Sequence, residues 1–234
     1  MTPLQIGLIG CVLLFGLLFT SMPVGFAMLI SGLVGFALIV SPQAATSMIT
    51  AELFDTFSSY NLTVIPLFVL MGQVAFHAGI STRLFKTAYT WIGHFPGGLA
   101  MATIGACAGF GAISGSGPAT AATMASVALP EMKRYHYSDE LASGAVASGG
   151  SLGMLIPPSV VFIVYALMTE QSIGALFLAG VVPGIVISIL FCLSILVRCI
   201  RNPTLGPAGP KATWKERFKS LNGVMETLIL FFFV

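Results

Sequence analysis

Charged side chains are scarce in this chain. Its 234 residues include only ten Lys and Arg and eight Asp and Glu, which together make up 8% of the sequence. An average soluble domain carries about 25%. Apolar residues account for 56%, and there are 26 glycines in addition. This composition excludes an ordinary soluble enzyme and is typical of a membrane protein.

Motifs for metal, nucleotide and nucleic-acid binding are also missing. The four cysteines stand singly in or beside apolar tracts, with no CxxC pair and no neighbouring histidine that would complete a metal set. No glycine-rich loop ends in GK[ST], so no nucleotide site is recognisable. A net charge of +2 is too small to indicate nucleic-acid binding. The N-terminus lacks the basic region and cleavage site of a signal peptide, so its apolar run predicts a first membrane helix.

Most of the chain consists of tracts without charge that are long enough to cross a bilayer, which takes about 20 helical residues. The predicted crossings are 4–22, 24–40, 62–79, 139–168 and 172–199. Two half-amphipathic segments, 44–60 and 81–95, lie between them. Helices of that kind usually lie in the plane of the membrane interface.

The stretch 97–134 does not fit a simple pair of crossings. Seventeen uncharged residues lead to a Ser-Gly-Ser-Gly-Pro sequence at 114–118, and the stretch from Pro118 to Pro130 is only 13 residues long. At 1.5 Å per residue the second arm reaches about 20 Å, short of the roughly 30 Å hydrocarbon core. We therefore predict a re-entrant helical hairpin whose tip lies near mid-membrane, buried in protein or beside a polar cavity.

The distribution of basic residues predicts the orientation of these crossings. With the N-terminus outside, all ten Lys and Arg fall on the cytoplasmic side, including those near residue 200. The reverse orientation would place all ten outside. Because five crossings is an odd number, a tandem copy of this unit would insert upside down, as in many secondary transporters.

Two places break the helical pattern inside the membrane, at 111–120 and at 149–159. Glycines permit a non-helical tip at the first, and Pro118 suits the first turn of a new helix. At the second, Pro157 and Pro158 lack N–H groups, which frees carbonyls near Gly153 and Leu155. Freed carbonyls suit a small cation, whereas half-helix N-termini suit a carboxylate. Nearby hydroxyls that can assist either ion are those of Ser114, Ser116, Thr120, Ser151 and Ser159. The alternative is that both breaks are kinks that allow close helix packing.

An intramembrane serine hydrolase is the enzymatic alternative. Neither Ser114 nor Ser116 has the Gly-x-Ser-Gly spacing of such nucleophiles. The three histidines, His77, His94 and His136, lie at predicted helix ends or in a loop, away from the hairpin tip. We therefore predict that the chain is not an enzyme.

The amino-acid sequence around the two breaks resembles that of the large membrane (M) subunit of tripartite ATP-independent periplasmic (TRAP) transporters. The similar segments are 109–116 (GFGAISGS), 119–124 (ATAATM), 130–132 (PEM), 153–159 (GMLIPPS), 169–174 (TEQSIG) and 179–184 (AGVVPG). The resemblance implies an all-α inner-membrane protein, the permease of a sodium-driven importer of organic acids such as sialic acid or C4-dicarboxylates. It also implies a small membrane (Q) subunit and a periplasmic substrate-binding protein as partners. The fold it implies is one inverted repeat of an elevator-type transporter.

The same resemblance implies particular site residues and domains. The implied sodium ligands are Ser114, Ser116, Gly153, Ile156 and Pro157, and the implied substrate-binding residues are Ser116, Thr120, Ser151, Pro158 and Ser159. The implied domains are scaffold helices in 1–95, a transport half in 96–200 and a cytoplasmic linker with an interfacial helix in 201–234. Because the family's large subunit is about twice as long, we expect this chain to be truncated and to hold half of the site. A membrane scaffold subunit without its own ion site is the alternative function.

Overall fold

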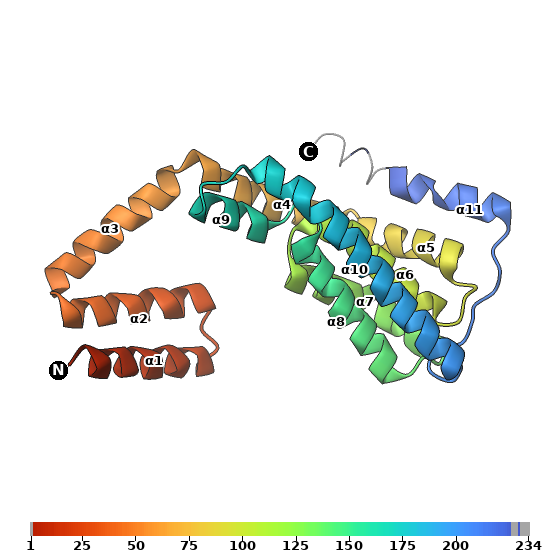
Figure 1. The fold of residues 1–234 in the computed structure, drawn as a ribbon, viewed down its shortest axis with the longest axis horizontal. Coiled ribbons are helices and arrows are strands. Elements are labelled where there is room, and N and C mark those ends of the chain that lie inside the picture. The colour runs from red at the N-terminus through yellow and green to blue at the C-terminus, as the bar shows by residue number, and fades with distance from the viewer. Residues whose placement is uncertain (1, 226–228, 230–234) are drawn as a thin grey trace. The chain divides into compact units, whose positions relative to one another are not determined.

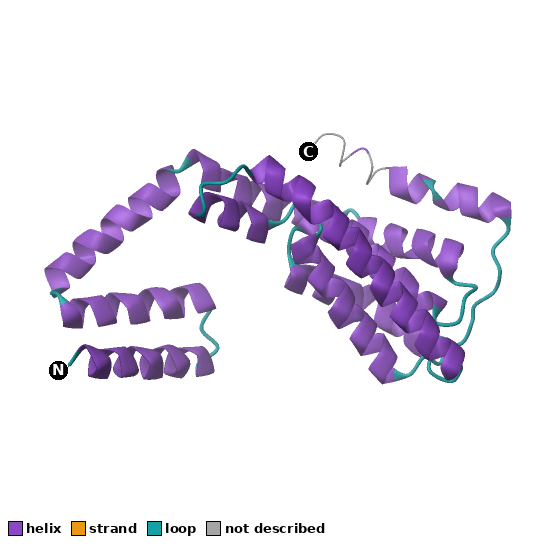
Figure 2. Ribbon diagram, viewed as in Figure 1, coloured by secondary structure: helices purple, strands orange, loops and turns teal. Residues whose placement is uncertain are grey.

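The computed structural model describes residues 2–225 and 229, and every regular element in this part of the chain is a helix (Figures 1 and 2). The helices form two compact units, Met1–Thr63 and Val64–Val234. The all-α prediction is confirmed, whereas the division into scaffold and transport parts is a functional one and stays a prediction.

The first unit contains three helices, two of them apolar, that expose most of their large side chains. They are α1 (Pro3–Phe19), α2 (Val24–Ile39) and α3 (Pro42–Ser58), followed by the 3₁₀ turn η1 (Tyr60–Thr63). Thr2 and Ser41 cap the starts of α1 and α3, and a proline occupies the first turn of each. Only Ile6, Ala27 and Ala45 are buried in these helices. Such an exposed apolar surface fits contact with lipid or with other membrane helices.

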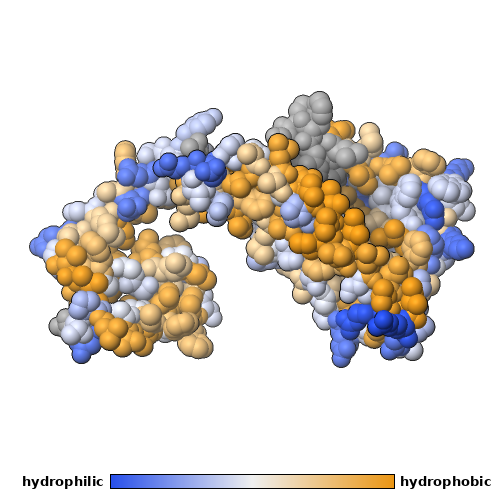
Figure 3. Space-filling model, in the orientation of Figure 1, coloured by the Kyte–Doolittle hydropathy of each residue, from blue (hydrophilic) through white to orange (hydrophobic). Residues whose placement is uncertain are grey.

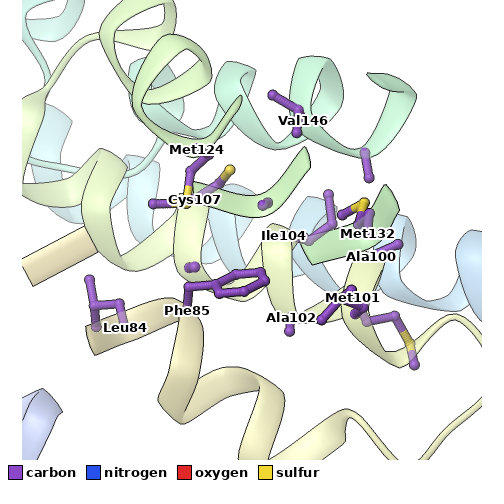
Figure 4. Packing of buried hydrophobic residues seen from close by; sticks show 14 of the residues in the cluster. Leu84, Phe85, Ala100, Met101, Ala102, Ile104, Cys107, Met124, Met132 and Val146 are labelled. Carbon is purple, nitrogen blue, oxygen red and sulfur yellow. The ribbon is translucent and has the colours of Figure 1, made fainter. Parts of the chain in front are cut away.

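The second unit holds the remaining helices. They are α4 (Val64–His77), α5 (Ile80–Ile92), α6 (Gly98–Ser114), α7 (Gly117–Arg134), α8 (Asp139–Leu155), α9 (Val160–Met168), α10 (Ile173–Arg201) and α11 (Trp214–Ser220). Its core is built around α6, which is buried along nearly its whole length. Figure 4 shows Phe85 of α5, Ile104 and Cys107 of α6, and Met124 of α7 within one apolar cluster. The helices that contribute the candidate site are therefore packed on one another.

Several helices are long and apolar enough for a membrane. By length and composition α10 can cross alone, and two bent pairs can each form a crossing: α4 with α5, bent by 64°, and α8 with α9, bent by 41°. Shorter apolar helices are α1, α2 and α6. In Figure 3 the surface along α10 forms a hydrophobic band that ends in a hydrophilic patch, where its last turn carries Arg198 and Arg201.

Two predicted elements differ in extent. A crossing was expected at 62–79, but α4 has only 14 residues because η1 precedes it and a glycine with φ of +74°, Gly79, follows it. The reach of the second hairpin arm was counted only from Pro118 to Pro130, whereas α7 runs through Pro130 to Arg134, the predicted end of the hairpin. Pro130 removes one N–H donor without ending the helix, so the arm is longer than the 13 residues on which its 20 Å reach was based.

Residues 202–209, here called the strap, tie the base of the hairpin together. The Gly206 carbonyl accepts the Gly97 N–H at 2.9 Å, and the Leu205 carbonyl accepts the Ser138 N–H at 3.0 Å. The buried Tyr137 hydroxyl donates to the Pro207 carbonyl at 2.9 Å and accepts the Leu99 N–H at 3.1 Å. Both ends of the hairpin and the start of α8 therefore meet at one point.

Phenylalanine at position 137 is expected to lower stability. Burial raises the pKa of the Tyr137 hydroxyl above its ordinary value, so it stays protonated and donates at neutral pH. Its loss leaves a carbonyl and an N–H without partners, at a cost of about 1–3 kcal/mol. The measurement is the apparent melting temperature of the purified permease. Tyr165→Phe is the matched control, because the Tyr165 ring is 55% exposed. Equal melting temperatures for the two variants would contradict the prediction.

Candidate functional site

The hairpin reverses direction through two residues. Gly115 ends α6 with a positive φ of +60°, a conformation that favours glycine, and donates its N–H to the Gly111 carbonyl. Ser116 then begins α7 as its N-cap, with its hydroxyl accepting the Ala119 N–H at 3.4 Å, and Pro118 lies in the first turn. The glycine, cap and proline together produce the tip that the sequence predicted.

The break between α8 and α9 follows from its two prolines. Pro157 and Pro158 occupy the positions whose N–H groups would bond the carbonyls of Gly153 and Met154. The Ser159 hydroxyl replaces one of these bonds by donating to the Met154 carbonyl at 2.6 Å. The predicted split helix is confirmed, with α8 ending at Leu155 and α9 beginning at Val160.

The freed carbonyls do not all face the hairpin. The Leu155 carbonyl lies 3.1 Å from the position that a Cβ would take on Gly180 of α10, so it points toward α10. The Ile156 side chain also packs toward α10, with its Cγ1 2.7 Å from the Cβ position of Gly184. The Leu155 carbonyl, one of those that the break frees, therefore faces α10 and not the hairpin.

Hairpin tip and helix break are in backbone contact. A Cβ added to Gly111 would lie 2.6 Å from the Cα of Gly153, and one added to Gly153 would lie 2.6 Å from the Thr120 Oγ1. The Val160 N–H donates to the Gly115 carbonyl at 3.4 Å, which joins the start of α9 to the tip. The tip thus reaches the level at which α8 ends, while α9 continues for nine more residues.

A chain of hydroxyl groups lies inside the tip. The Thr120 hydroxyl donates to the Ser116 carbonyl at 2.8 Å and lies 2.8 Å from the Ser114 Oγ. Because the proton of Thr120 is used, Ser114 is the donor between the two hydroxyls. The lone pairs of the Ser114 oxygen stay available, with only a 3.4 Å contact from the Ser116 N–H.

Most of the predicted site residues come together and one does not. Those at the contact between tip and break are Ser114, Ser116, Thr120, Gly153, Pro158 and Ser159. Pro157 is in the same break, and Ile156 lies there with its side chain toward α10. Ser151 is exposed on α8, with its hydroxyl bonded to the Ser148 carbonyl, so it is apart from the others.

A cavity of about 420 Å³ opens beside the tip, between α4, α6 and α7. Ser114 and Ser116 contribute to its wall, together with three polar residues that the sequence analysis did not single out: Gln73, Thr123 and Ser126. Its apolar wall consists of Val69, Gly72, Phe76, Phe110, Ala119 and Ala122. A signal for Gln73 was available, because it is the one amide side chain in the apolar run of α4.

The polar groups at this site are all neutral. None of the residues that line the cavity carries a charge. Among the described residues, no three His, Cys, Asp or Glu side chains gather as a metal-binding group would require. The site offers hydroxyls, backbone carbonyls and the N–H groups at the starts of α7 and α9, a set that suits a weakly held small cation and an anion at a helix N-terminus.

The helices and the site define a class of protein. An all-helical membrane protein in which a helical hairpin meets a broken helix has the architecture of the substrate and ion sites of secondary transporters. Over residues 11–234 the sequence matches the family described as "Tripartite ATP-independent periplasmic transporter, DctM component". The chain belongs to this family, the large membrane subunits of TRAP transporters.

Individual relatives agree with this assignment. The chain is 39% identical to the C4-dicarboxylate TRAP transporter large permease protein DctM of Pseudomonas aeruginosa over 82% of its length, which is 44% of that protein. It is 34% identical to the sialic acid TRAP transporter large permease protein SiaM of Vibrio cholerae over 92% of its length, which is 49% of that protein. It is also 30% identical to the ectoine TRAP transporter large permease protein TeaC of Halomonas elongata over 89% of its length, 48% of that protein. The chain thus spans about half the length of the curated relatives that it matches.

Proposed function

We propose that this chain supplies one inverted repeat of the permease in a sodium-coupled importer of an organic acid anion. The observation that carries the proposal is the contact between the hairpin tip and the α8–α9 break, which brings the Gly153 backbone against Gly111 and Thr120, next to a cavity that Ser114 and Ser116 help to line. Membership of the TRAP family supports the transport function. The relatives' names support a carboxylate such as a C4-dicarboxylate or sialic acid as the substrate.

The sodium ligands we propose are neutral oxygens. The Gly153 carbonyl has no N–H donor four residues ahead, and the Ser114 hydroxyl keeps lone pairs available. With carbonyls of Ile156 and Pro157 and the tip at Ser116, they would replace the water that sodium loses. A neutral set binds sodium weakly, which suits an ion that must be released in each cycle.

The substrate we propose lies next to this ion, against Ser116, Thr120, Pro158 and Ser159. Its carboxylate would face the N-termini of α7 and α9, where N–H groups and the helix dipoles favour negative charge. The cavity beside the tip extends this site toward Gln73. Since Ser151 faces away from the tip, it is not part of the proposed pocket in this half.

Movement, orientation and partners are further parts of the proposal. The hairpin and the broken helix would move together as an elevator, with the N-terminus outside and the segment near residue 200 in the cytoplasm. The partners would be a small membrane subunit and a periplasmic binding protein. One relative, the isethionate TRAP transporter permease protein DctMQ of Oleidesulfovibrio alaskensis, is 40% identical over 66% of this chain, which is 24% of that protein.

Uptake in proteoliposomes is expected to require a sodium gradient. The experiment uses the full-length permease with its small subunit and its binding protein, and measures uptake of the acid that the binding protein carries. We expect uptake with an inward sodium gradient and none when potassium replaces sodium, because a cage of carbonyl groups distinguishes between ions by their size. Equal uptake with potassium would contradict sodium coupling. No uptake with either ion, although the binding protein is loaded, would favour the scaffold alternative.

A further inference from the structure

Helix α11 has the composition of a helix that lies against a lipid surface. Trp214 and Phe218 are four residues apart and are 68% and 62% exposed. Lys215 and Lys219 have the same spacing and are also exposed. Aromatic and basic residues combined in this way are typical of helices at the membrane interface.

Contacts with α5 fix the position of α11. The Thr87 hydroxyl donates to the Ser220 carbonyl at 2.8 Å, and the rings of Trp91 and Phe218 meet edge to face with centroids 6.5 Å apart. The opposite face of α5 is buried in the core through Leu84 and Phe85. The two helices therefore present one continuous surface.

A cavity of about 530 Å³ lies between α5 and residues 210–220, which comprise α11 and the segment before it. Tyr89 and Thr90 of α5 line one side, and Lys211, Lys219 and Ser220 line the other. The cavity thus combines hydroxyl groups with two ammonium groups, which is the donor set that a phosphate needs.

Positive charge dominates this surface. Residues 211–220 contain four cations and a single carboxylate, Glu216, which also lines the cavity. That carboxylate accepts the N–H of Thr213 at 2.8 Å and its hydroxyl at 2.9 Å, and these two bonds lower the pKa of Glu216. Among the residues that the structure describes, no carboxylate forms an ion pair with Lys211 or Lys219. Their charge is available to an external anion.

A second observation points to a missing acceptor on the same two helices. Within the described part of the chain, the indole Nε1 of Trp91 and the Nε of Arg217 are buried without a hydrogen-bond partner. The guanidinium of Arg217 lies 5.1 Å from the centre of the Trp214 ring, which keeps it beside the aromatic residues. Buried N–H groups are nearly always paired, so these two lack an acceptor, although neither residue lines the cavity itself.

We infer that the α5–α11 surface binds the headgroup of an anionic phospholipid. Lys211 and Lys219 hold the phosphate, while Trp214 and Phe218 lie among the acyl chains. Zwitterionic lipids fit less well, because the four cations of residues 211–220 outnumber the single carboxylate, Glu216. The inference depends on a membrane location and not on transport, so a failure of sodium coupling would leave it intact.

Fluorescence quenching tests this inference, because Trp91 and Trp214 are the chain's two tryptophans. The full-length permease is reconstituted in vesicles with a rising fraction of dibrominated phosphatidylglycerol, or of dibrominated phosphatidylcholine. The fluorescence that reports on this surface is the part of the total tryptophan emission that W91F and W214F each remove. We expect half-maximal quenching at a lower fraction of phosphatidylglycerol than of phosphatidylcholine. Each of Lys211→Gln and Lys219→Gln should raise the fraction of phosphatidylglycerol that is needed for half-maximal quenching about fivefold.

A matched control removes the same charge elsewhere. Lys133→Gln and Arg134→Gln change two cations in the last turn of α7 and should leave the quenching unchanged. Retention of phosphatidylglycerol in native mass spectrometry gives a second readout if a variant is unstable. Equal quenching by the two lipids would overturn the inference. So would an equal effect of the substitutions at Lys211 and Lys219 and of those at Lys133 and Arg134. Displacement by inorganic phosphate alone would also overturn it, because the site would then bind a soluble anion.

Discussion

Alanine at Gly111 is expected to reduce sodium-dependent uptake by at least about fivefold. The new methyl group would lie 2.6 Å from the Cα and 2.9 Å from the N of Gly153, so backbone on α8 would have to move. Forcing extra volume into a packed interior costs about 1–3 kcal/mol, and each 1.4 kcal/mol is about a tenfold change in an equilibrium. The measurement is initial uptake rate with the full transporter, at equal amounts of folded protein.

Gly105→Ala is the control for this substitution. Gly105 lies on the same helix, but its added Cβ would meet only the Cβ of Ala88, at an ordinary 3.8 Å. Alanine there should be tolerated or slightly stabilising, because it favours the helix by up to about 1 kcal/mol. Gly153→Val should behave like Gly111→Ala, since its side chain would meet the Ser116 carbonyl and the Thr120 hydroxyl. Normal uptake in both would mean that tip and break need not touch.

Alanine at Pro157 is expected to raise the sodium concentration for half-maximal uptake. The new N–H group can bond the Gly153 carbonyl four residues earlier, which removes that oxygen from the proposed ion site. An intramolecular hydrogen bond contributes about 0.5–1.5 kcal/mol, so a change of about three- to tenfold is expected.

Two other variants make this result specific. Pro130→Ala also restores an N–H donor inside a helix, but at the base of the hairpin, and should leave the sodium dependence unchanged. Ser114→Ala should have a smaller effect than Pro157→Ala, because it removes one hydroxyl and leaves the backbone in place. The broken helix would be a packing kink if Pro157→Ala folded normally and bound sodium as before.

The elements of this fold were largely predictable because their signals are local. Prolines, glycines and caps determine where the hairpin turns and where α8 ends, and both were placed correctly. The start of α4 was not, since the 3₁₀ turn before it has no proline or glycine signal of its own. The length of the second hairpin arm was underestimated because a helix tolerates a proline when neighbouring helices pack around it, and α7 runs through Pro130.

The arrangement of the site was harder to predict because it depends on contacts between distant residues. The backbone contact of Gly111 with Gly153 is a feature of packing, and glycine-rich stretches alone do not show which pairs meet. Ser151 fits the polar pattern of the break, yet its direction on α8 turns it outward. The contact of the Leu155 carbonyl with α10 could be predicted only by knowing the path of a helix that begins 18 residues later. Gln73 joined the site only when α4 was seen to pack on the hairpin.

The strap bears on how the protein is made. Gly97 and its acceptor Gly206 are separated by more than 100 residues, and ribosomes add about 5–20 residues each second. For at least about 3.5 s after the hairpin has been made, the N–H groups of Gly97, Leu99 and Ser138 have no protein acceptor. Water or lipid headgroups must satisfy them during this interval, because the hydrocarbon core of the bilayer has no acceptors to offer. The base of the hairpin must therefore stay at the membrane–water interface during synthesis. The hairpin becomes fixed only when the strap has been synthesised.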